Sequence, residues 1–246
     1  GNNACTVTGP AFTAVFNGDG KKITGFNPVV KLKEGTTFGL FAILKDATVK
    51  NVELNGTFNV EAEGTADAGM LVGTAFHSTI SNVKINGKIV SAGTTSSKRF
   101  AVGGLCGFIF AGSENEVTGT SLIENCTTNA DVEMLGGTNV ANGAGGSMYG
   151  GIAGFATTPN ADAAHRVTIK GCVNNGNMNT NLGRCSGILA TANAGTTLED
   201  CTNNGDQVNK NNNGRLGNVV CNVSNYCHLK NCVNNGDLDA TVSGYK

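Results

Sequence analysis

Short apolar blocks separated by polar turn residues recur along the whole chain, and they fall into a fixed frame. In each of six copies, a small apolar anchor residue is followed three positions later by Asn. The anchors are Val52, Val83, Cys126, Cys172, Cys201 and Cys232, and the asparagines are Asn55, Asn86, Asn129, Asn175, Asn204 and Asn235. The anchors are 29 to 46 residues apart. Self-similarity at such a period predicts a repeat architecture.

A second, glycine-rich block precedes each anchor. Its six copies are FGLFA (38–42), GMLVG (69–73), GGLCG (103–107), GGIAG (150–154), SGILA (186–190) and GNVVC (217–221), and a partial earlier unit lies at 12–26. Blocks rich in Val, Ile and Leu and bounded by Asn, Gly and Asp are typical of strands and turns. Apolar residues at helical spacing are missing, which excludes repeats of paired helices. The predicted fold class is therefore all-β.

If each repeat forms one coil, the fold is a right-handed parallel β-helix, a solenoid of about six to seven coils. We expect the anchors to point inward as a Val/Cys column and the glycine-rich blocks to form tight inner turns. We expect the six asparagines to lie at positive φ, with amides hydrogen bonded from coil to coil as an Asn ladder. Within VKNVEL, Val49, Val52 and Leu54 cannot all share one face of a straight strand.

The repeats predict one domain over residues 1–246. Residues 1–35 are expected to form an N-terminal coil or cap, residues 36–240 the six repeats, and residues 241–246 a tail. Solenoids need capped ends. Because the chain ends directly after a full repeat, we expect a partner or a further domain to cover the C-terminal face.

The repeats resemble the GLUG-motif family of bacterial secreted and cell-surface proteins. Its pattern is roughly G-G-L-V-G followed by I-x-N-C-x-x-x-G-x-V, and the nearest copies are GGLCGF (103–108) with LIENCTTNADV (122–132) and GGIAGF (150–155) with VTIKGCVNNGNM (167–178). FTAVFNGDGKKITGF (12–26) resembles the family's first coil, with Ala14 in place of Gly and Asn17 in place of Asp. The resemblance implies a scaffold or adhesin-like stalk and implies no specific activity.

Charge and hydropathy limit the classes of partner that the chain is expected to bind. The chain has 17 basic and 18 acidic residues, a net charge of −1, so the basic surplus of a nucleic-acid-binding protein is missing. No apolar run reaches the length of a membrane-spanning segment. The first residue is Gly rather than Met, and we expect that an export signal has been removed. The predicted location is extracellular or at the cell surface.

The nine cysteines are an odd number, so at least one is unpaired or pairs between chains. Stacked anchor side chains run parallel, which leaves their Cβ atoms slightly too far apart for a disulfide. We therefore expect a buried column of free thiols. The anchor cysteines have no C-x-x-C spacing, so zinc is disfavoured. No cofactor and no catalytic, cofactor-binding or metal-binding residue is predicted.

Enzymes with a β-helix fold need clustered carboxylates and basic residues in one groove. Here the position two after the Asn carries Thr57, Lys88, Asp131, Asn177, Asp206 and Asp237. Asp206 and Asp237 fall in adjacent coils and can share a cation, although a solvated turn edge is the simpler interpretation. A polysaccharide-acting lyase or glycoside hydrolase is thus an alternative function. NGDG (17–20) lacks the spaced carboxylates of a calcium loop and is interpreted as a hairpin-like turn.

Two insertions give the more specific prediction. Coils three and four carry about eight extra residues each at the same corner, within loops 109–120 and 156–166. Insertions in solenoids often form binding surfaces. The predicted contact residues are Ser113, Glu114, Asn115, Glu116, Asn160, Asp162, His165 and Arg166. The sequence thus favours a non-enzymatic adhesin-like protein that binds a host or microbial surface glycan or protein. A structural stalk of a larger surface protein is a further alternative.

Overall fold

The structure, a computed structural model, describes residues 9–94, 98–112, 119–134, 146–158, 165–181, 183–209 and 215–240. Within these ranges the chain forms 27 strands, β1 to β27, and no helix. The strands form three sheets, and every pair of neighbouring strands is parallel. The predicted all-β class is confirmed for the described residues, and the stacked parallel sheets are those of a β-helix or solenoid.

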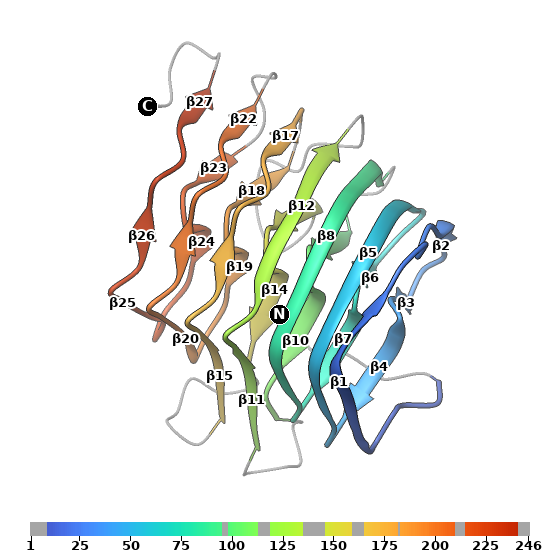
Figure 1. Cartoon of the computed structure of the whole chain (residues 1–246). Coiled ribbons are helices and arrows are strands. Elements are labelled where there is room, and N and C mark those ends of the chain that lie inside the picture. The colour runs from blue at the N-terminus through green and yellow to red at the C-terminus, as the bar shows by residue number, and fades with distance from the viewer. Residues whose placement is uncertain are drawn as a thin grey trace.

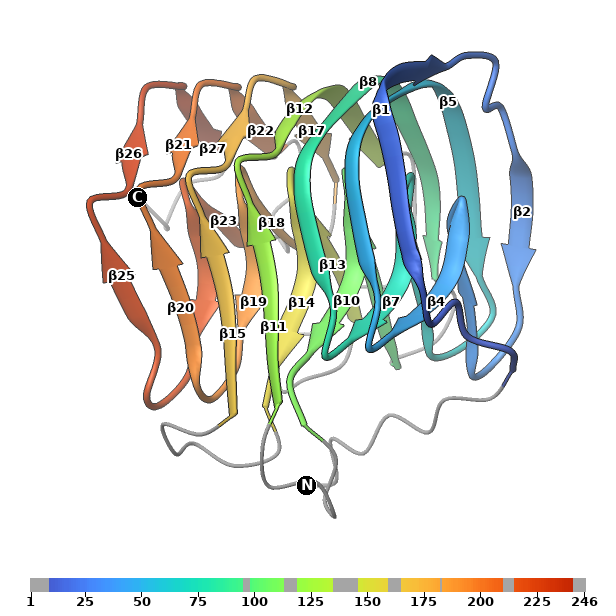
Figure 2. The same ribbon diagram turned by 60° about the horizontal axis from the view of Figure 1, so that its bottom comes forward.

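The large sheet has fifteen strands and forms the face seen in Figure 1. Its strands are β1 (Val15–Ile23), β2 (Val29–Leu32), β5 (Thr48–Ala62), β8 (Thr79–Thr94), β11 (Gly119–Glu124), β12 (Thr127–Met134), β15 (His165–Lys170), β16 (Val173–Asn174), β17 (Met178–Thr180), β20 (Thr196–Glu199), β21 (Thr202–Asn203), β22 (Gln207–Asn209), β25 (His228–Lys230), β26 (Val233–Asn234) and β27 (Leu238–Ala240). Successive repeats lie side by side in chain order across this sheet (Figure 2).

Two smaller sheets of six strands each lie behind the large one. The second sheet contains β4 (Phe41–Lys45), β7 (Val72–Phe76), β10 (Cys106–Phe110), β14 (Ala153–Thr157), β19 (Leu189–Ala192) and β24 (Val220–Val223). The third sheet contains β3 (Thr36–Phe38), β6 (Ala66–Gly69), β9 (Arg99–Gly103), β13 (Gly146–Gly150), β18 (Arg184–Ser186) and β23 (Arg215–Gly217). Each repeat contributes one strand to each small sheet and then returns to the large sheet.

The large sheet bends at the residue just before each anchor. In β5, Val49, Val52 and Leu54 are all buried, although no straight strand brings them to one face. Asn51 lies between them at φ 55°, and this left-handed residue resets the alternation of side chains. The bend residues of the six repeats are Asn51, Asn82, Asn125, Gly171, Asp200 and Asn231, all at positive φ.

This bend corrects the expectation for the asparagines three positions after the anchor. None of them is among the positive-φ residues of the described chain. They lie past the bend, beside an extended ladder in which Asn55 pairs with Asn86 and Asn86 with Asn129. Positive φ occurs instead at the six bend residues. These are all Asn, Asp or Gly, the residue types that adopt positive φ at least cost.

The glycine-rich blocks form the tight turns between the third and second sheets. A Cβ added to Gly104 would lie 2.0 Å from the carbonyl oxygen of Gly151, and one added to Gly151 would lie 2.1 Å from that of Gly187. Stacked turns this close leave no room for side chains. The sequence expectation of a crowded inner turn is therefore confirmed at these positions.

The main core lies between the large sheet and the two small ones, and it contains five of the six anchors in buried positions. Cys232, in the last repeat, is half-buried. The eight cysteines of the described residues are free thiols. The Cys201 thiol donates to the carbonyls of Ile169 and Glu199 at 3.4 and 3.3 Å. Hydrogen bonding with Cys172, together with burial, raises the pKa of Cys201 to about 12.

A second, smaller apolar cluster lies between the second and third sheets and includes Phe108 and Phe155. Arg99 lies over the Phe108 ring, 4.5 Å from its centroid. Arg99 Nε and Nη2 donate to the two carboxylate oxygens of Asp67 at 3.1 and 2.7 Å. Burial raises the pKa of the Asp67 carboxyl, and the Arg99 guanidinium opposes that rise. This ion pair links β6 and β9, adjacent strands of the third sheet, next to the aromatic rings.

Candidate functional site

The two insertions leave and re-enter the fold at neighbouring positions. At their start, Phe110 of β10 pairs with Thr157 of β14. At their end, Gly119 of β11 pairs with His165 of β15. Both insertions therefore connect the second sheet to the large sheet, at one corner of adjacent repeats. The predicted loop limits were too wide, because residues 109–110, 119–120, 156–157 and 165–166 belong to strands.

Most of the predicted contact residues lie outside the part of the chain that the structure describes. Ser113, Glu114, Asn115, Glu116, Asn160 and Asp162 lie outside the described residues, as does the side chain of His165. Arg166 is exposed and is the second residue of β15, paired with Thr120. The described flanks thus bring the insertions together at their bases, and the contact residues themselves stay a prediction.

The column two positions after the repeat asparagines, which contains Asp206 and Asp237, has a structural role. Asp206 Oδ1 accepts a hydrogen bond from the backbone N–H of Asp237 at 2.9 Å. Asn177 Oδ1 accepts from the backbone N–H of Asp206, and Asp131 Oδ1 accepts from the backbone N–H of Asn177. These side chains therefore link each repeat to the next. In the part of the chain that the structure describes, no group of three or more His, Cys, Asp or Glu residues is placed to hold a metal ion.

The asparagines of the repeat frame are hydrogen bonded in series on the outer face of the large sheet. Asn86 Nδ2 donates to Asn55 Oδ1 at 2.6 Å, and Asn129 Nδ2 donates to Asn86 Oδ1 at 2.7 Å. The series continues with Asn175, Asn204 and Asn235, each donating to its predecessor at 2.8 Å. These amides bond to each other rather than converging on a ligand.

Sequence reasoning missed a polar hollow near the N-terminal end of the large sheet. Where β5 bends at Asn51, β1 bulges outward, and its register with β5 shifts between Asn17 and Lys21. NGDG (17–20) is therefore a bulge inside a strand and not the hairpin-like turn predicted. The bulge brings Gly18 so close to β5 that a Cβ there would lie 2.6 Å from the Asn51 carbonyl oxygen, so a side chain would not fit. The sequence signal for this bulge was the pair Gly18 and Gly20 on either side of Asp19. It could be interpreted only with the register between β1 and β5, which the sequence does not give.

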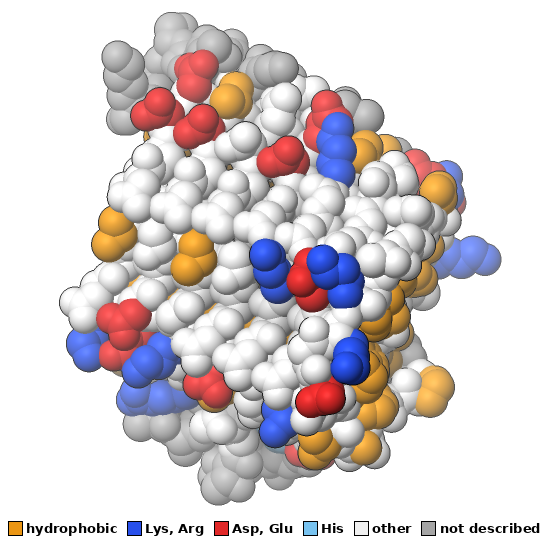
Figure 3. Space-filling view, viewed as in Figure 1, with side chains coloured by type: hydrophobic (Ala, Val, Ile, Leu, Met, Phe, Trp, Pro, Cys, Tyr) orange, Lys and Arg blue, Asp and Glu red, His pale blue; other side chains and the backbone are white. Residues whose placement is uncertain are grey.

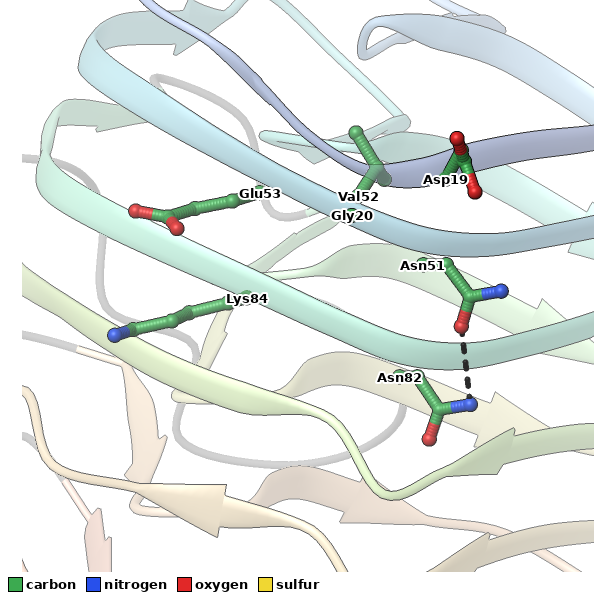
Figure 4. Close-up of a pocket in the computed structure, with 7 residues that line it drawn as sticks. All are labelled: Asp19, Gly20, Asn51, Val52, Glu53, Asn82 and Lys84. Atoms are coloured by element: carbon green, nitrogen blue, oxygen red, sulfur yellow. Dashed lines mark hydrogen bonds between the residues drawn. The ribbon is translucent and has the colours of Figure 1, made fainter.

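The hollow is an open depression of about 420 Å³ lined by Asp19, Gly20, Asn51, Val52, Glu53, Asn82 and Lys84. In Figure 4, Asp19 and the two asparagines lie on one side, and Glu53 and Lys84 extend toward the other. Asn51 Nδ2 donates to Asn17 Oδ1 at 3.0 Å, and Asn82 Nδ2 donates to Asn51 Oδ1 at 3.2 Å. The amide groups of Asn51 and Asn82 are thus held in fixed orientations.

Charges around the hollow balance. Lys22 Nζ lies 2.9 Å from Glu53 Oε1, and Asn86 Nδ2 donates to the same oxygen at 2.8 Å. The Lys22 hydrogen bond holds the pKa of Glu53 below its usual value. Lys84 pairs with Glu53 in the register of β5 and β8, and its charge also lowers the pKa of Glu53. The hollow therefore has the Asp19 carboxylate beside ordered amides on one side and the Glu53 and Lys84 charges on the other.

The rest of this face is polar with few charges. Figure 3 shows small groups of acidic and basic side chains on a mostly uncharged surface. In the last repeat, Leu229, Val233 and Leu238 are 48%, 47% and 45% exposed. That a partner or a further domain covers the C-terminal face stays a prediction. The described residues include no helix long and apolar enough to cross a membrane.

Comparison with known proteins adds information on the fold. No family model matches the chain, and no curated protein does. A crystal structure described as "a putative immunoglobulin A1 protease from Bacteroides ovatus" is similar, with a TM-score of 0.61 and 20% sequence identity. The match covers 89% of this chain and 59% of that chain. At this identity the likeness concerns the fold, which the two chains share over most of the present sequence.

Proposed function

We propose that this chain is a non-enzymatic, adhesin-like β-helix of a secreted or cell-surface bacterial protein. It binds a surface glycan or protein through the two inserted loops. The observation that carries the proposal is the pairing of the insertion flanks, Phe110 with Thr157 and Gly119 with His165. Two insertions based on adjacent strands form one contact surface, whereas insertions at unrelated corners would not.

The proposed architecture behind this surface is a right-handed parallel β-helix of six to seven coils. The hydrogen-bonded series from Asn55 to Asn235 acts in it as an Asn ladder, and the chain is one domain. Support comes from the six strands in each small sheet and from the parallel pairing of equivalent residues. Crossovers between parallel strands are almost always right-handed. The GLUG resemblance stays part of this proposal.

The alternative of a polysaccharide-acting enzyme is less well supported. It would place catalytic or cation-binding carboxylates at the Asp206 and Asp237 edge. Asp206 Oδ1 is already an acceptor for the next repeat's backbone N–H. The Asp206 side chain thus has a structural role in linking two repeats. The third possibility, a stalk of a larger surface protein, differs from the proposal in having no ligand.

Binding and turnover must be measured together to test the proposal. The purified chain is applied to an array of glycans, mucins and matrix proteins, and a parallel assay follows depolymerisation of the same polysaccharides. Two variants replace residues 112–118 and 158–164, separately, by short Gly/Ser linkers. We expect selective binding without turnover by the intact chain, and weaker binding by each variant.

Three results would count against the proposal. Turnover of any polysaccharide favours the enzyme, and absence of binding favours the stalk. Binding that survives both loop replacements places the contact surface elsewhere. Thermal unfolding of each variant, compared with the intact chain, separates lost contacts from lost folding.

A further inference from the structure

We propose that the hollow at the bulge of β1 is a second binding site, one for the hydroxyl groups of a neutral sugar. The site lies over the bend of the large sheet, at Asn51 and Asn82. The inserted loops enter at a different corner, where the second sheet meets the large sheet. The inference therefore does not depend on the function proposed for the loops.

The chemistry of the lining selects the ligand class. Asp19 supplies a carboxylate that accepts two hydrogen bonds, and Lys84 supplies an ammonium that donates up to three. Beside Asp19, the hydrogen bonds from Asn51 to Asn17 and from Asn82 to Asn51 fix both amide groups, and Lys84 lies on the opposite side of the hollow (Figure 4). Neighbouring sugar hydroxyls both donate and accept, so they match the carboxylate and amide groups of Asp19, Asn51 and Asn82, with the Lys84 ammonium as a further donor across the hollow.

Other ligand classes fit less well. The two carboxylates and two ammonium groups of Asp19, Glu53, Lys22 and Lys84 cancel, so neither an anion nor a cation is favoured. No metal-binding cluster is found among the described residues. The lining has one aliphatic residue, Val52, and no aromatic ring, so an apolar ligand would gain little.

Pre-organisation makes the site more than a patch of polar surface. The bulge sets Asp19 at φ 50°, and the backbone N–H of Asp19 donates to Asn17 Oδ1 at 3.1 Å. The same oxygen accepts from Asn51, which couples the bulge to the amide row. A ligand therefore meets groups that are already ordered, although an open depression gives weak affinity, about 1 mM or weaker for a single short sugar.

The test is a titration followed by NMR with the full chain. The probes are neutral trisaccharides of glucose, galactose and mannose, with trigalacturonate and triglycine as competitors of other chemistry. Asp19→Asn removes the charge and keeps a residue that tolerates positive φ. Asp239→Asn makes the same change on an exposed residue of the last repeat and serves as the control.

We expect at least one neutral trisaccharide to give saturable shifts of the Asn51 and Asn82 side-chain amides. Asp19→Asn should weaken that binding at least about threefold, whereas Asp239→Asn and the two loop replacements should leave it unchanged. Absence of saturation by every neutral sugar would overturn the proposal. Equal binding by Asp19→Asn, or tighter binding of trigalacturonate or triglycine, would overturn it as well.

Discussion

The paired asparagines of the later repeats have opposite surroundings. In VNNG and TNNG, the second Asn lies on the outer face, while the first is buried at Asn174 and Asn203 and partly buried at Asn234. Asn174 Nδ2 donates to Asn203 Oδ1 at 2.8 Å, and Asn203 Nδ2 donates to Asn234 Oδ1 at 2.7 Å. Each inner amide also donates to the carbonyl of the Gly two residues later. The inner row therefore satisfies buried backbone groups just past the bend.

The inner row should matter more to stability than the outer row. Asn203→Ala removes the side-chain donor to the Gly205 carbonyl, the acceptor of one Asn174 Nδ2 bond and the donor to Asn234 Oδ1, and it should lower the free energy of unfolding by about 3 kcal/mol. Asn204→Ala, one residue away and exposed, should cost less than about 1 kcal/mol. Urea unfolding of both variants measures the difference. Equal losses would contradict the assignment of roles.

The thiol column gives a pH dependence with a definite sign. The pKa of Cys201 is about 12 in the folded chain, against about 8.5 for an unfolded cysteine. Because the folded pKa is raised, the stabilisation is complete below about pH 8.5 and is lost as the pH rises toward 12.

Replacing this thiol should flatten the alkaline limb of the stability curve. Cys201→Val introduces the residue type that Val52 and Val83 place in the same column. Between pH 9 and 10.5, the free energy of unfolding of the variant should fall less steeply than that of the intact chain, by about 1.4 kcal/mol per pH unit. Urea unfolding at several pH values gives both slopes. Identical slopes would mean that the thiol titrates normally in the fold.

At the scale of the element, the bend decides which residues reach the core. Alternation along one strand predicted that Val49, Val52 and Leu54 diverge, yet all three are buried. Asn51 between them could have been recognised, since its equivalents in the six repeats are all Asn, Asp or Gly. The strand class, the anchors and the glycine turns were predictable because they follow from short-range patterns. The resetting of alternation was not, because it depends on one backbone angle.

A substitution at one bend tests this account. Asn125 lies at φ 53°, and the equivalent residue of the next repeat is Gly171, at φ 60°. Asn125→Gly should therefore be tolerated within about 0.5 kcal/mol. Asn125→Val should cost about 1 to 2 kcal/mol, because a β-branched residue is strained in the left-handed region. Thermal unfolding of the pair gives the comparison, and equal stability of the two variants would argue against the bend.

For the whole molecule, contacts between strands of successive repeats are not predicted by any local pattern. Asp67 and Arg99 are 32 residues apart and meet only after the third sheet is assembled. The hollow likewise depends on the register between β1 and β5. The loop corner was predictable because insertion lengths can be counted along the chain. Its contact residues were chosen by polarity alone, and most lie outside the described residues.

The buried ion pair predicts a non-additive pair of substitutions. Asp67→Ala leaves the Arg99 guanidinium without its carboxylate partner against Phe108, and it should cost about 3 to 5 kcal/mol. The double variant Asp67→Ala with Arg99→Met removes both charges and keeps apolar contact with the rings. It should be more stable than Asp67→Ala alone. A double variant less stable than the single one would show that Arg99 has a more important partner than Asp67.

The most direct test of the central claim is to measure how the intact chain and the two loop-replacement variants bind the same immobilised ligand. The ligand is whichever glycan or protein the array identifies. The account predicts that either replacement weakens binding at least about tenfold, because both insertions start and end on paired strands. The chains should unfold at similar temperatures. Unchanged affinity in both folded variants would contradict the account.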